Sequence, residues 1–339
     1  MKRIAINGFG RIGRCVLRAL NERAAEFNFE IVAINEPADL DTIAYLTRYD
    51  STHGRFPSSV EKTDNGLEVN DRVIHVSHFQ DIADLPWQQL DVDLVLECSG
   101  VYSSREEAKR HLQAGARRVL FSQPANADVD ATIVYGVNDH ELKATDMIVS
   151  NASCTTNGIV PVISCLQAAF GIRAGHITTL HSMMNDQPVI DAYHHTDLRK
   201  TRSASQSLIP VDTQLAKGIE RILPTMTGRF SASAVRVPTT NVSAMELVVQ
   251  LDQNVTREQV NAALSDASTR VLSGVLGFST EPLASCDYNH DRRSGIVDGE
   301  QTAVIGDNLA KVFIWFDNEW GFANRMLEVS DKMLRFPQS

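Results

Sequence analysis

Over the first 150 residues, short apolar segments alternate with segments whose apolar residues recur at helical spacing. Strands that alternate with helices in this way form mostly parallel, doubly wound sheets, so this half predicts an α/β fold. Residues 54–78 differ, because Asn65-Gly66 separates two alternating segments and predicts an inserted antiparallel hairpin. The expected strands are residues 3–6, 29–34, 94–96, 119–121 and 133–137, and residues 105–114 are an expected helix.

Beyond residue 150, longer segments alternate between apolar and polar residues, which is typical of half-buried antiparallel strands. A capping-box pattern from Thr256 to Gln259 opens a helix. A long stretch at 182–228 is polar and irregular in its middle, and loops of this length in a compact domain usually have a function or form an interface. We therefore expect an α+β domain with a large, mostly antiparallel sheet and helices on one side. The expected strands are 176–180, 232–237, 244–251 and 309–315, the expected helices are 154–170 and 319–336, and the buried face of the capped helix is Val260, Leu264, Ala267 and Val271.

Composition limits the classes of function. With 339 residues, of which 43% are hydrophobic, the chain is long enough for two folded domains. It has 32 Lys and Arg against 42 Asp and Glu, a net charge of −10, which argues against general binding of nucleic acid or anionic membranes. A local basic pocket for one small phosphate remains compatible with this charge.

The cysteines favour a reducing compartment. They stand at positions 15, 98, 154, 165 and 286, an odd number without C-x-x-C spacing, so we expect neither a disulfide framework nor a metal site. The first residues form an expected strand instead of a secretory signal, and no run of 18 apolar residues predicts a membrane span. The expectation is a cytoplasmic protein.

A glycine-rich turn, Gly8-x-Gly10-x-x-Gly13, follows the first expected strand and opens a helix. Such glycines allow a tight turn and close approach to a pyrophosphate at the helix N-terminus. Glu36 follows the second strand, where a carboxylate binds the ribose 2′-hydroxyl and repels a 2′-phosphate, so NAD is favoured over NADP. The alternatives are a glycine turn that only packs the helix on the strand, and a Glu36 that is a surface carboxylate.

Cys154 and His181 form a candidate catalytic pair. Cys154 stands at the start of an apolar helix, whose positive end lowers a thiol pKa toward the thiolate. His181 ends an expected strand, and could form an ion pair with the thiolate or act as its base. On a chain that binds a dinucleotide, the pair suggests a covalent thiohemiacetal route with hydride transfer to nicotinamide. The alternative for a single cysteine is a buried apolar filler, and the other four keep that interpretation.

Long motifs along the whole chain resemble the glyceraldehyde-3-phosphate dehydrogenase superfamily. They are INGFGRIGR at 6–14, YDSTHGRF at 49–56, SNASCTTN at 150–157, RVPT at 236–239 and DNEWGFANRM at 317–326. The resemblance implies a Rossmann-type NAD domain at 1–150, a catalytic domain at 151–317 and a C-terminal helix at 318–339 that returns to the first domain. It also implies a homotetramer in which the long loop reaches a neighbouring subunit's cofactor site.

Residue roles follow from the resemblance by position. Cys154 matches the nucleophile and His181 the base that activates its thiol. The resemblance leaves open whether Arg199 or Lys200 contacts phosphate, and Gln80 stands where an arginine near the adenine is common. The implied substrate-binding residues are Ser153, Thr155, Arg199, Lys200, Thr213, Gln214 and Arg236. The implied cofactor-binding residues are Gly8, Gly10, Arg11, Ile12, Gly13, Glu36, Gln80, Ser122 and Asn318.

Three departures separate this chain from the glycolytic pattern. Met184 replaces a threonine three residues after the base, Gln214 replaces a glycine after Thr213, and Gly158 replaces a second cysteine. Methionine offers no donor to phosphate, and a side chain at 214 crowds backbone N–H groups that approach an anion.

With the segments at 189–194, 207–213 and 286–291, these departures resemble the erythrose-4-phosphate dehydrogenase branch of the superfamily. That branch implies oxidation of a phosphorylated aldehyde through a thioester hydrolysed by water. The product, 4-phosphoerythronate, would lie on a route toward pyridoxal 5′-phosphate. Two alternatives stay open: a phosphorylating glyceraldehyde-3-phosphate dehydrogenase, and a non-catalytic protein that binds NAD or nucleic acid.

Overall fold

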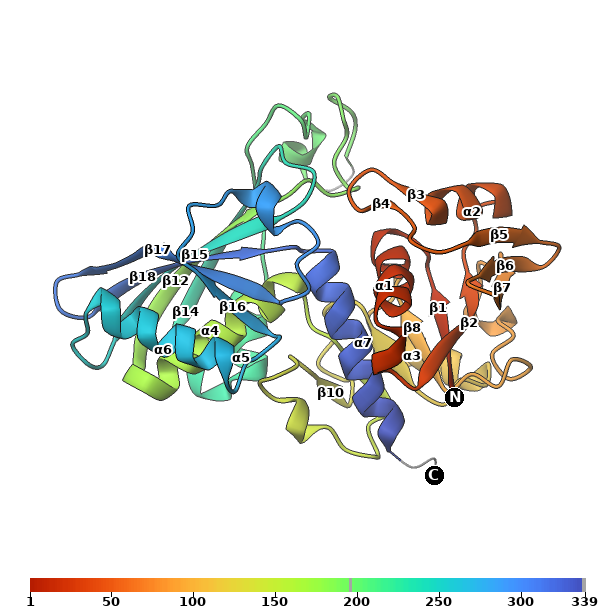
Figure 1. Cartoon of the computed structure of the whole chain (residues 1–339), viewed down its shortest axis with the longest axis horizontal. Coiled ribbons are helices and arrows are strands. Elements are labelled where there is room, and N and C mark those ends of the chain that lie inside the picture. The colour runs from red at the N-terminus through yellow and green to blue at the C-terminus, as the bar shows by residue number, and fades with distance from the viewer. Residues whose placement is uncertain (195–196, 337–339) are drawn as a thin grey trace. The chain divides into compact units, whose positions relative to one another are not determined.

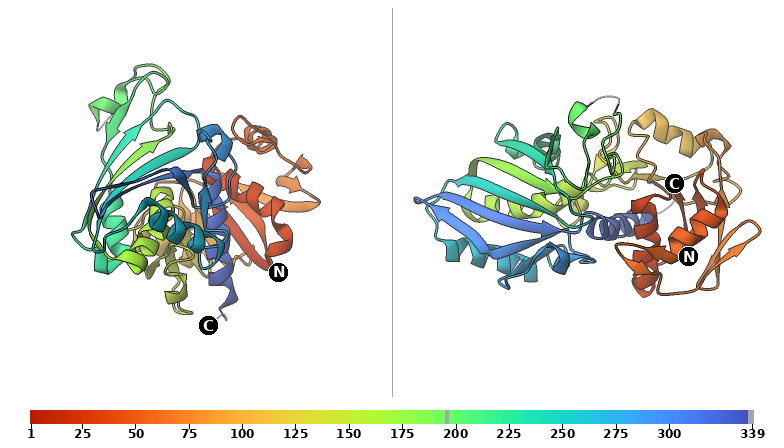
Figure 2. Two further views of the ribbon diagram at one scale, coloured as in Figure 1. Left: turned by 60° about the vertical axis from the view of Figure 1, so that its left-hand side comes forward. Right: turned by 90° about the horizontal axis from the view of Figure 1, so that it is seen from above.

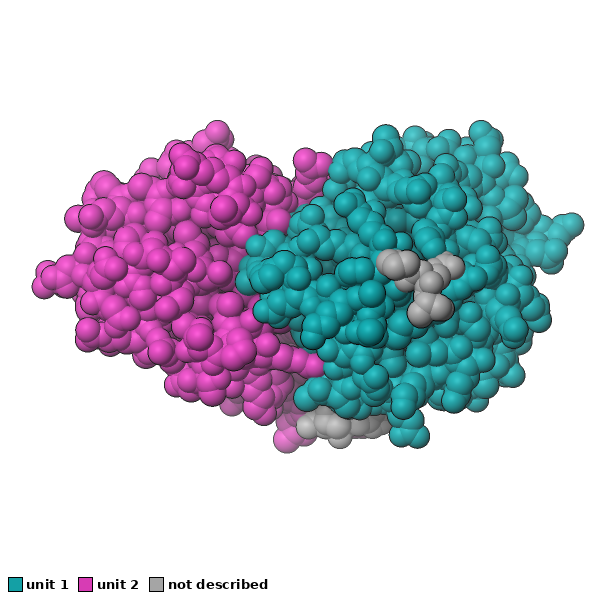
Figure 3. Space-filling model, turned by 90° about the horizontal axis from the view of Figure 1, so that it is seen from below, with its two compact units in different colours: residues 1–153, 322–339 teal, residues 154–321 magenta. Residues whose placement is uncertain are grey.

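The computed structural model describes residues 1–194 and 197–336. Predictions that fall on residues 195–196, in the long polar stretch, and on 337–339, in the C-terminal segment, lie outside the described residues. The chain divides into two compact units. Unit 1 is Met1–Ser153 together with the segment from Phe322, and unit 2 is Cys154–Gly321 (Figure 3).

Unit 1 contains one large sheet in the order β10-β11-β9-β8-β1-β2-β7-β6-β5. From β10 to β7 all neighbouring strands are parallel, which confirms the doubly wound sheet, and β6 and β5 add an antiparallel edge. Because β1 lies between β2 and β8, the strand order reverses beside β1, where open α/β sheets bind ligands. The strands are β1 (Lys2–Asn7), β2 (Phe29–Asn35), β5 (Val60–Thr63), β6 (Gly66–Val69), β7 (Arg72–Ser77), β8 (Leu94–Glu97), β9 (Val119–Phe121), β10 (Ala131–Thr132) and β11 (Ile148–Ser150).

Two details of unit 1 differ from the sequence prediction. The strand expected at 133–137 is wrong: Gly136 has φ +84°, and the Asn138 side chain binds the backbone of Thr132 and Val134, so the chain turns there. The hairpin is confirmed, but its turn residues are 64–65, and Gly66 opens β6. A Cβ at Gly66 would lie 2.0 Å from the carbonyl oxygen of Ile74.

The C-terminal helix joins unit 1. α7 (Trp320–Arg335) begins in unit 2, and from Phe322 onward it belongs to unit 1. Arg23, after the end of α1, donates to Asn324 at 2.7 Å and to Glu328 at 3.1 Å. The other helices of unit 1 are α1 (Arg11–Glu22), α2 (Leu40–Arg48) and α3 (Arg105–Gln113), and β3 (Tyr49–Asp50) pairs with β4 (Gly54–Arg55).

Unit 2 contains a second sheet in the order β13-β14-β12-β15-β18-β17-β16. Its pairings are antiparallel except for β12 with β14 and β16 with β17, which confirms the mostly antiparallel sheet. Helices α4, α5 and α6 lie on one face of it (Figures 1 and 2). The elements are α4 (Cys154–Phe170), β12 (Ile172–His181), β13 (Ile209–Val211), α5 (Leu215–Ile222), β14 (Phe230–Arg236), β15 (Ser243–Leu251), α6 (Arg257–Thr269), β16 (Leu276–Ser279), β17 (Gly295–Ile305) and β18 (Leu309–Phe316).

The capping box of α6 is present, and Val260, Leu264 and Ala267 are buried as predicted. Val271 is not on this face: it follows the helix end and is 83% exposed. In the described part of the chain, none of the helices combines the length and apolar character that crossing a membrane requires.

Candidate active site

The glycine turn of unit 1 has three glycines with different tasks. Gly8 has φ +88°, and a Cβ on it would lie 2.4 Å from the backbone of Ser99. A Cβ on Gly13 would lie 2.5 Å from the Gly8 carbonyl oxygen, so Gly13 lets α1 pack on β1. Gly10 differs, because a Cβ there meets no described atom within 4 Å. Gly8 and Gly13 are therefore required for the packing of the fold, whereas Gly10 leaves open space at the start of α1.

This turn fits a pyrophosphate. α1 begins at Arg11 without a side-chain cap hydrogen bond and without an acidic residue in its first turn among the described residues. Its N-terminal N–H groups and the positive end of its dipole favour an anion. Glu36 follows β2, and its carboxylate accepts from the N–H of Phe9 at 2.8 Å and of Ala38 at 3.3 Å. The carboxylate thus lies against the glycine turn, where a ribose hydroxyl would be bound.

The remaining predicted cofactor residues of unit 1 follow the same sheet edge. Gln80 is exposed beyond the end of β7, and Ser122 follows β9 directly. Ile12 is partly buried in the first turn of α1. The guanidinium of Arg11 is paired with Asp50. Burial would raise the pKa of Asp50, but hydrogen bonds from Arg11 and two backbone N–H groups hold it well below its usual range. The side chain of Arg11 therefore holds the 50–55 turn, so that only its backbone would be left to contact a cofactor.

In unit 2, the predicted catalytic pair lies together. Cys154 is the first residue of α4, and His181 is the last residue of β12. The Sγ atom of Cys154 is 3.7 Å from Nε2 of His181. On its other side, Nδ1 of His181 is 2.8 Å from the carbonyl oxygen of Ser182. A carbonyl only accepts, so Nδ1 carries the proton and Nε2 turns its lone pair toward the thiol.

The charge state of the pair corrects the sequence prediction. Burial raises the pKa of Cys154 to about 11, although Arg236 and the N–H groups of Thr155 and Cys154 oppose this. Burial and the nearby Arg236 lower the pKa of His181 to about 4. Both shifts favour a neutral thiol beside a neutral imidazole. The helix terminus does not outweigh burial, so His181 is placed to accept the thiol proton as a base.

Arg236 is a partly buried cation with two buried donors, Nε and Nη1, that no described residue uses. It ends β14, directly opposite His181 in the parallel pairing with β12. Its Nε and Nη1 atoms are buried, and no described residue accepts a hydrogen bond from either. Burial lowers the pKa of Arg236, while Asp186 and Cys154 oppose that shift. A partly buried guanidinium with unused donors is well suited to bidentate contact with a phosphate.

The two basic residues at 199–200 have different surroundings. Lys200 is partly buried, and its Nζ lies 2.7 Å from Oδ2 of Asp186. Burial would raise the pKa of Asp186, but Lys200 and Arg236 hold it below its usual value. Arg199 is exposed. The geometry therefore groups Lys200 with Arg236 around one carboxylate and leaves Arg199 outside that group.

Thr213 and Gln214 precede α5. The Thr213 hydroxyl accepts from the N–H of Leu215 at 3.2 Å, and Gln214 is exposed at the N-cap position. A Cβ on Gly218 of α5 would lie 2.8 Å from the Thr156 hydroxyl of α4, so the first turns of both helices pack closely. Met184 is 45% exposed, and its N–H donates to the Gln187 side chain at 3.1 Å.

The residues around the nucleophile include one strained position. Ser153 and Thr155 flank Cys154 and are partly buried. Ala152 has φ +56°, a region that costs a residue with a Cβ about 1–2 kcal/mol. Such strain is concentrated at functional sites, and here it lies two residues before the nucleophile.

Asn318 follows β18 and belongs to unit 2 with the catalytic pair, unlike the other predicted cofactor residues. Its Oδ1 atom accepts from the hydroxyls of Ser182 and Ser243. Sequence reasoning missed Asp186, Ser182 and Ser243. Only the position of Ser182 beside His181 could have indicated one of them.

Gly158 explains one departure from the family pattern. A Cβ at this position of α4 would lie 2.8 Å from Cε of Met245 and 3.1 Å from the Ser294 carbonyl oxygen. A second cysteine four residues after the nucleophile would therefore require the Met245 side chain to move and the backbone at Ser294 to shift slightly.

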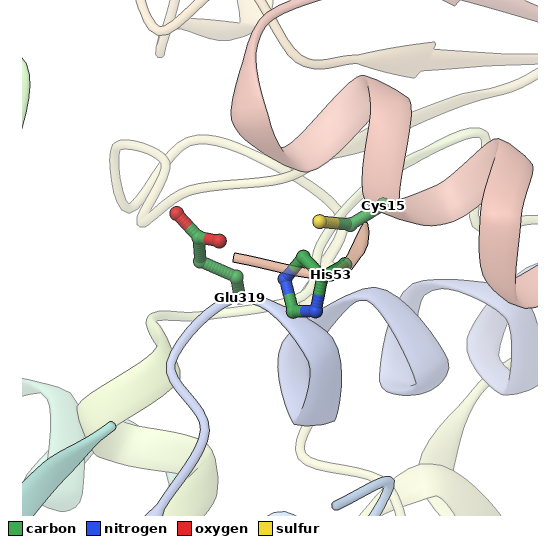
Figure 4. Close-up of side chains that lie close together, drawn as sticks. All are labelled: Cys15, His53 and Glu319. Carbon is green, nitrogen blue, oxygen red and sulfur yellow. The ribbon is translucent and has the colours of Figure 1, made fainter. Parts of the chain in front are cut away.

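Cys15 and His53 of unit 1 lie together outside the predicted site (Figure 4). The Cys15 sulfur and a ring nitrogen of His53 are within 4.8 Å of each other. One thiol and one imidazole are fewer ligands than the three or four of protein zinc sites, so this pair alone does not make a metal centre.

Comparison with protein families matches two segments of the chain. The glyceraldehyde 3-phosphate dehydrogenase NAD binding domain matches residues 2–105, which contain the glycine turn and Glu36. The glyceraldehyde 3-phosphate dehydrogenase C-terminal domain matches residues 153–318, which contain Cys154, His181 and Arg236. The match assigns NAD as the cofactor of the first domain and the class of NAD-dependent oxidoreductases to the chain. With both domains matched in order, the chain belongs to the glyceraldehyde 3-phosphate dehydrogenase family.

Proposed function

We propose that this protein oxidises D-erythrose 4-phosphate to 4-phosphoerythronate with NAD, and that water releases the product from the enzyme. The observation that carries the proposal is a contrast between two anion positions. Arg236 keeps buried donors without an acceptor among the described residues, whereas Met184 and Gln214 replace the groups that hold inorganic phosphate in glycolytic members.

Cys154 and His181 supply the covalent chemistry. Sγ of Cys154 forms a bond to the aldehyde carbon, while Nε2 of His181, 3.7 Å away, takes the thiol proton. The N–H groups at the start of α4 face the oxygen that becomes negative in this step. His181 returns the thiol proton to this oxygen, which gives a neutral thiohemiacetal and a neutral imidazole. NAD, when bound, supplies the acceptor for the hydride. His181 takes the hydroxyl proton in that step, which leaves a thioester on Cys154 and an imidazolium at His181.

Water then attacks the thioester carbon, and the C–S bond breaks to return the thiol. The overall reaction consumes one aldehyde, one NAD and one water, and yields one carboxylate, one NADH and two protons. After it releases the hydroxyl proton to solvent, His181 is neutral again and would act as the base for the attacking water.

Arg236 and Lys200 are the proposed contacts for the substrate's own phosphate. Lys200 already makes an ion pair with Asp186, whose charge also acts on Arg236. A phosphate that arrives here meets one guanidinium with free donors and one ammonium that can share its three donors. Arg199, which is exposed, is not proposed as a contact.

The second anion position is weakened in two ways. The Met184 side chain has no donor, and its backbone N–H is used by Gln187. At α5, the N–H of Leu215 is used by the Thr213 hydroxyl, and Gln214 adds a side chain where a glycine would leave room. Inorganic phosphate would therefore compete poorly with water for the thioester.

We also propose that the chain forms a homotetramer, as the family resemblance implies. Support comes from the segment 189–208, where Val189, Ile190, Tyr193, Leu198 and Leu208 are all strongly exposed apolar residues. Exposed apolar patches mark protein interfaces. Light scattering on the purified protein checks the assembly.

The deciding experiment measures NADH formation with erythrose 4-phosphate and with glyceraldehyde 3-phosphate, each with and without inorganic phosphate. We expect preference for the four-carbon aldehyde and no stimulation by phosphate. A strict phosphate requirement with the three-carbon aldehyde would instead show a phosphorylating enzyme. Cys154→Ala is the control: it must abolish oxidation while NAD still binds, and an absence of turnover in the unaltered protein with both aldehydes would indicate a non-catalytic NAD-binding protein.

A further inference from the structure

Ser182 connects the base to the residue proposed to hold the nicotinamide amide. It is fully buried, and each of its polar groups has a partner within unit 2. Its carbonyl oxygen accepts from Nδ1 of His181 at 2.8 Å, and its hydroxyl donates to Oδ1 of Asn318 at 2.9 Å. Its N–H donates to the hydroxyl of Ser243 at 3.0 Å.

Ser243 completes the arrangement from the neighbouring strand. It is 1% exposed at the start of β15, and its hydroxyl donates to the same Oδ1 of Asn318 at 2.8 Å. Asn318 itself is partly exposed, and no described residue hydrogen-bonds its Nδ2. The acceptor end of the amide therefore points into the protein, and its two N–H groups remain for a ligand.

The opposite orientation of the Asn318 amide is unfavourable. If Nδ2 faced the two hydroxyls, their protons would need other acceptors in a buried place. Within the described network, the two hydroxyl protons would then have only the contact between the two serine hydroxyls, which are 3.4 Å apart. That contact can accept one proton at most, so the other hydroxyl would lack an acceptor. Because buried donors without acceptors are costly, the two serines select one orientation of the amide.

The backbone before Ser243 supports a dedicated role for this position. Val242 is 3% exposed and has φ +63°, an outlying conformation for a β-branched residue. Next to it, Asn241 donates to Asp317 at 2.9 Å, the residue just before Asn318. Strain of this kind persists where the surrounding structure requires one geometry. Here it directs neighbouring residues toward Asp317 and Asn318.

We propose that Ser182 and Ser243 are positioning residues that hold Asn318 with its amide nitrogen toward the cofactor, so that the carbonyl oxygen of the nicotinamide carboxamide is the group recognised. The inference rests on the proposed role of Asn318. It adds that one residue, Ser182, sets both the tautomer of the base and the direction of the amide.

The test measures dissociation constants, without substrate, for NAD and two analogues. The acetylpyridine analogue keeps the carbonyl oxygen but loses the amide nitrogen, and the thionicotinamide analogue replaces that oxygen with sulfur, a weaker acceptor. We expect the unaltered protein to bind the acetylpyridine analogue about fivefold more tightly than the thio analogue, the worth of one ordinary hydrogen bond. In Ser182→Ala/Ser243→Ala this ratio should fall toward one, and NAD should bind about tenfold more weakly.

Asn318→Ala separates this inference from the proposed function. If Asn318→Ala leaves NAD binding unchanged, the proposed role of Asn318 fails. If it weakens NAD binding but the serine substitutions change neither affinity nor the analogue ratio, the positioning inference alone is overturned. In the Asn318→Ala background, the serine substitutions should have no further effect, and a persistent effect there would show a merely structural role.

Thr179→Val is the matched control, since Thr179 is a buried hydroxyl on the same strand as His181 and lies outside the proposed network. It should leave the analogue ratio unchanged. Should the double variant fail to fold, as judged by its unfolding transition and the alkylation rate of Cys154, Ser243→Ala alone carries the same test. An unchanged analogue ratio in a folded Ser243→Ala would also overturn the proposal.

Discussion

Arg236 and His181 are partner positions of two parallel strands, so the guanidinium and the imidazole stand at the same end of β14 and β12. Burial is the main cause that lowers the pKa of His181, and the positive charge of Arg236 lowers it further; the same charge opposes the rise of the Cys154 pKa that burial causes. One residue therefore acts on both members of the catalytic pair and also offers the unused donors for a phosphate. If Arg236 binds the substrate phosphate, as proposed, then substrate binding would change the protonation of the pair.

The first prediction concerns the pH dependence of Cys154 alkylation by neutral iodoacetamide. Below about pH 4, His181 is protonated and cannot accept the thiol proton, so the rate should fall as the pH drops through that value. A second step, to the free thiolate, should appear near pH 11, and both steps belong to the pair. Arg236→Leu removes a positive charge that lowers both pKa values, so both steps should move to higher pH. Steps that stay in place would show that Arg236 does not act on the pair.

The second prediction separates Lys200 from Arg199. Lys200→Ala should raise the KM for the aldehyde phosphate about tenfold, since it removes a partly buried ammonium beside Asp186 and Arg236. Arg199→Ala, at an exposed neighbouring position, should change KM by less than about twofold. Steady-state kinetics on both variants decide this, and the reverse ranking would assign the phosphate contact to Arg199.

The third prediction compares Gly8→Ala with Gly10→Ala. A Cβ at Gly8 would strike the backbone of Ser99 at a positive φ, so the free energy of unfolding should fall by about 1–3 kcal/mol. A Cβ at Gly10 meets no described atom, so Gly10→Ala should lower the free energy of unfolding by less than about 1 kcal/mol. It should nevertheless weaken NAD binding at least about tenfold, because the methyl group fills the space for the pyrophosphate. Denaturant unfolding and NAD titration measure the two effects. Tight NAD binding by Gly10→Ala would place the pyrophosphate elsewhere.

The fourth prediction concerns the nucleophile that releases the product. Met184→Thr together with Gln214→Gly should restore a donor and room for an anion, so turnover stimulated by inorganic phosphate should rise about tenfold. Met183→Thr is the matched control, one residue away, and should leave the phosphate response unchanged. An unchanged response in the double variant would mean that these two departures do not decide between water and phosphate.

Local patterns predicted much of this fold. The alternation of strands and helices indicated the parallel sheet, and the capping box placed the start of α6. Errors arose where a side chain or a turn redirected the chain, as Asn138 does after β10. Val271 was placed one turn too far along the helical pattern, because α6 ends before it. β17 was missed, although it is among the longest strands described, because its polar and glycine residues hide the alternation.

The candidate site also has features that the sequence predicted and features that it did not. Cys154 and His181 could be proposed from sequence because the helix start and the strand end are local signals. The charge state of the pair could not be predicted from sequence, because burial and Arg236 act through space on groups far apart in the chain. The sequence thus determined most of the elements, the glycine turn and the identities of the reactive groups, all of which depend on neighbours along the chain. Tertiary structure alone decided that Lys200 pairs with Asp186 and that the hydroxyls of two serines donate to Asn318, since hydrogen bonds and charge interactions depend on distances that only folding sets.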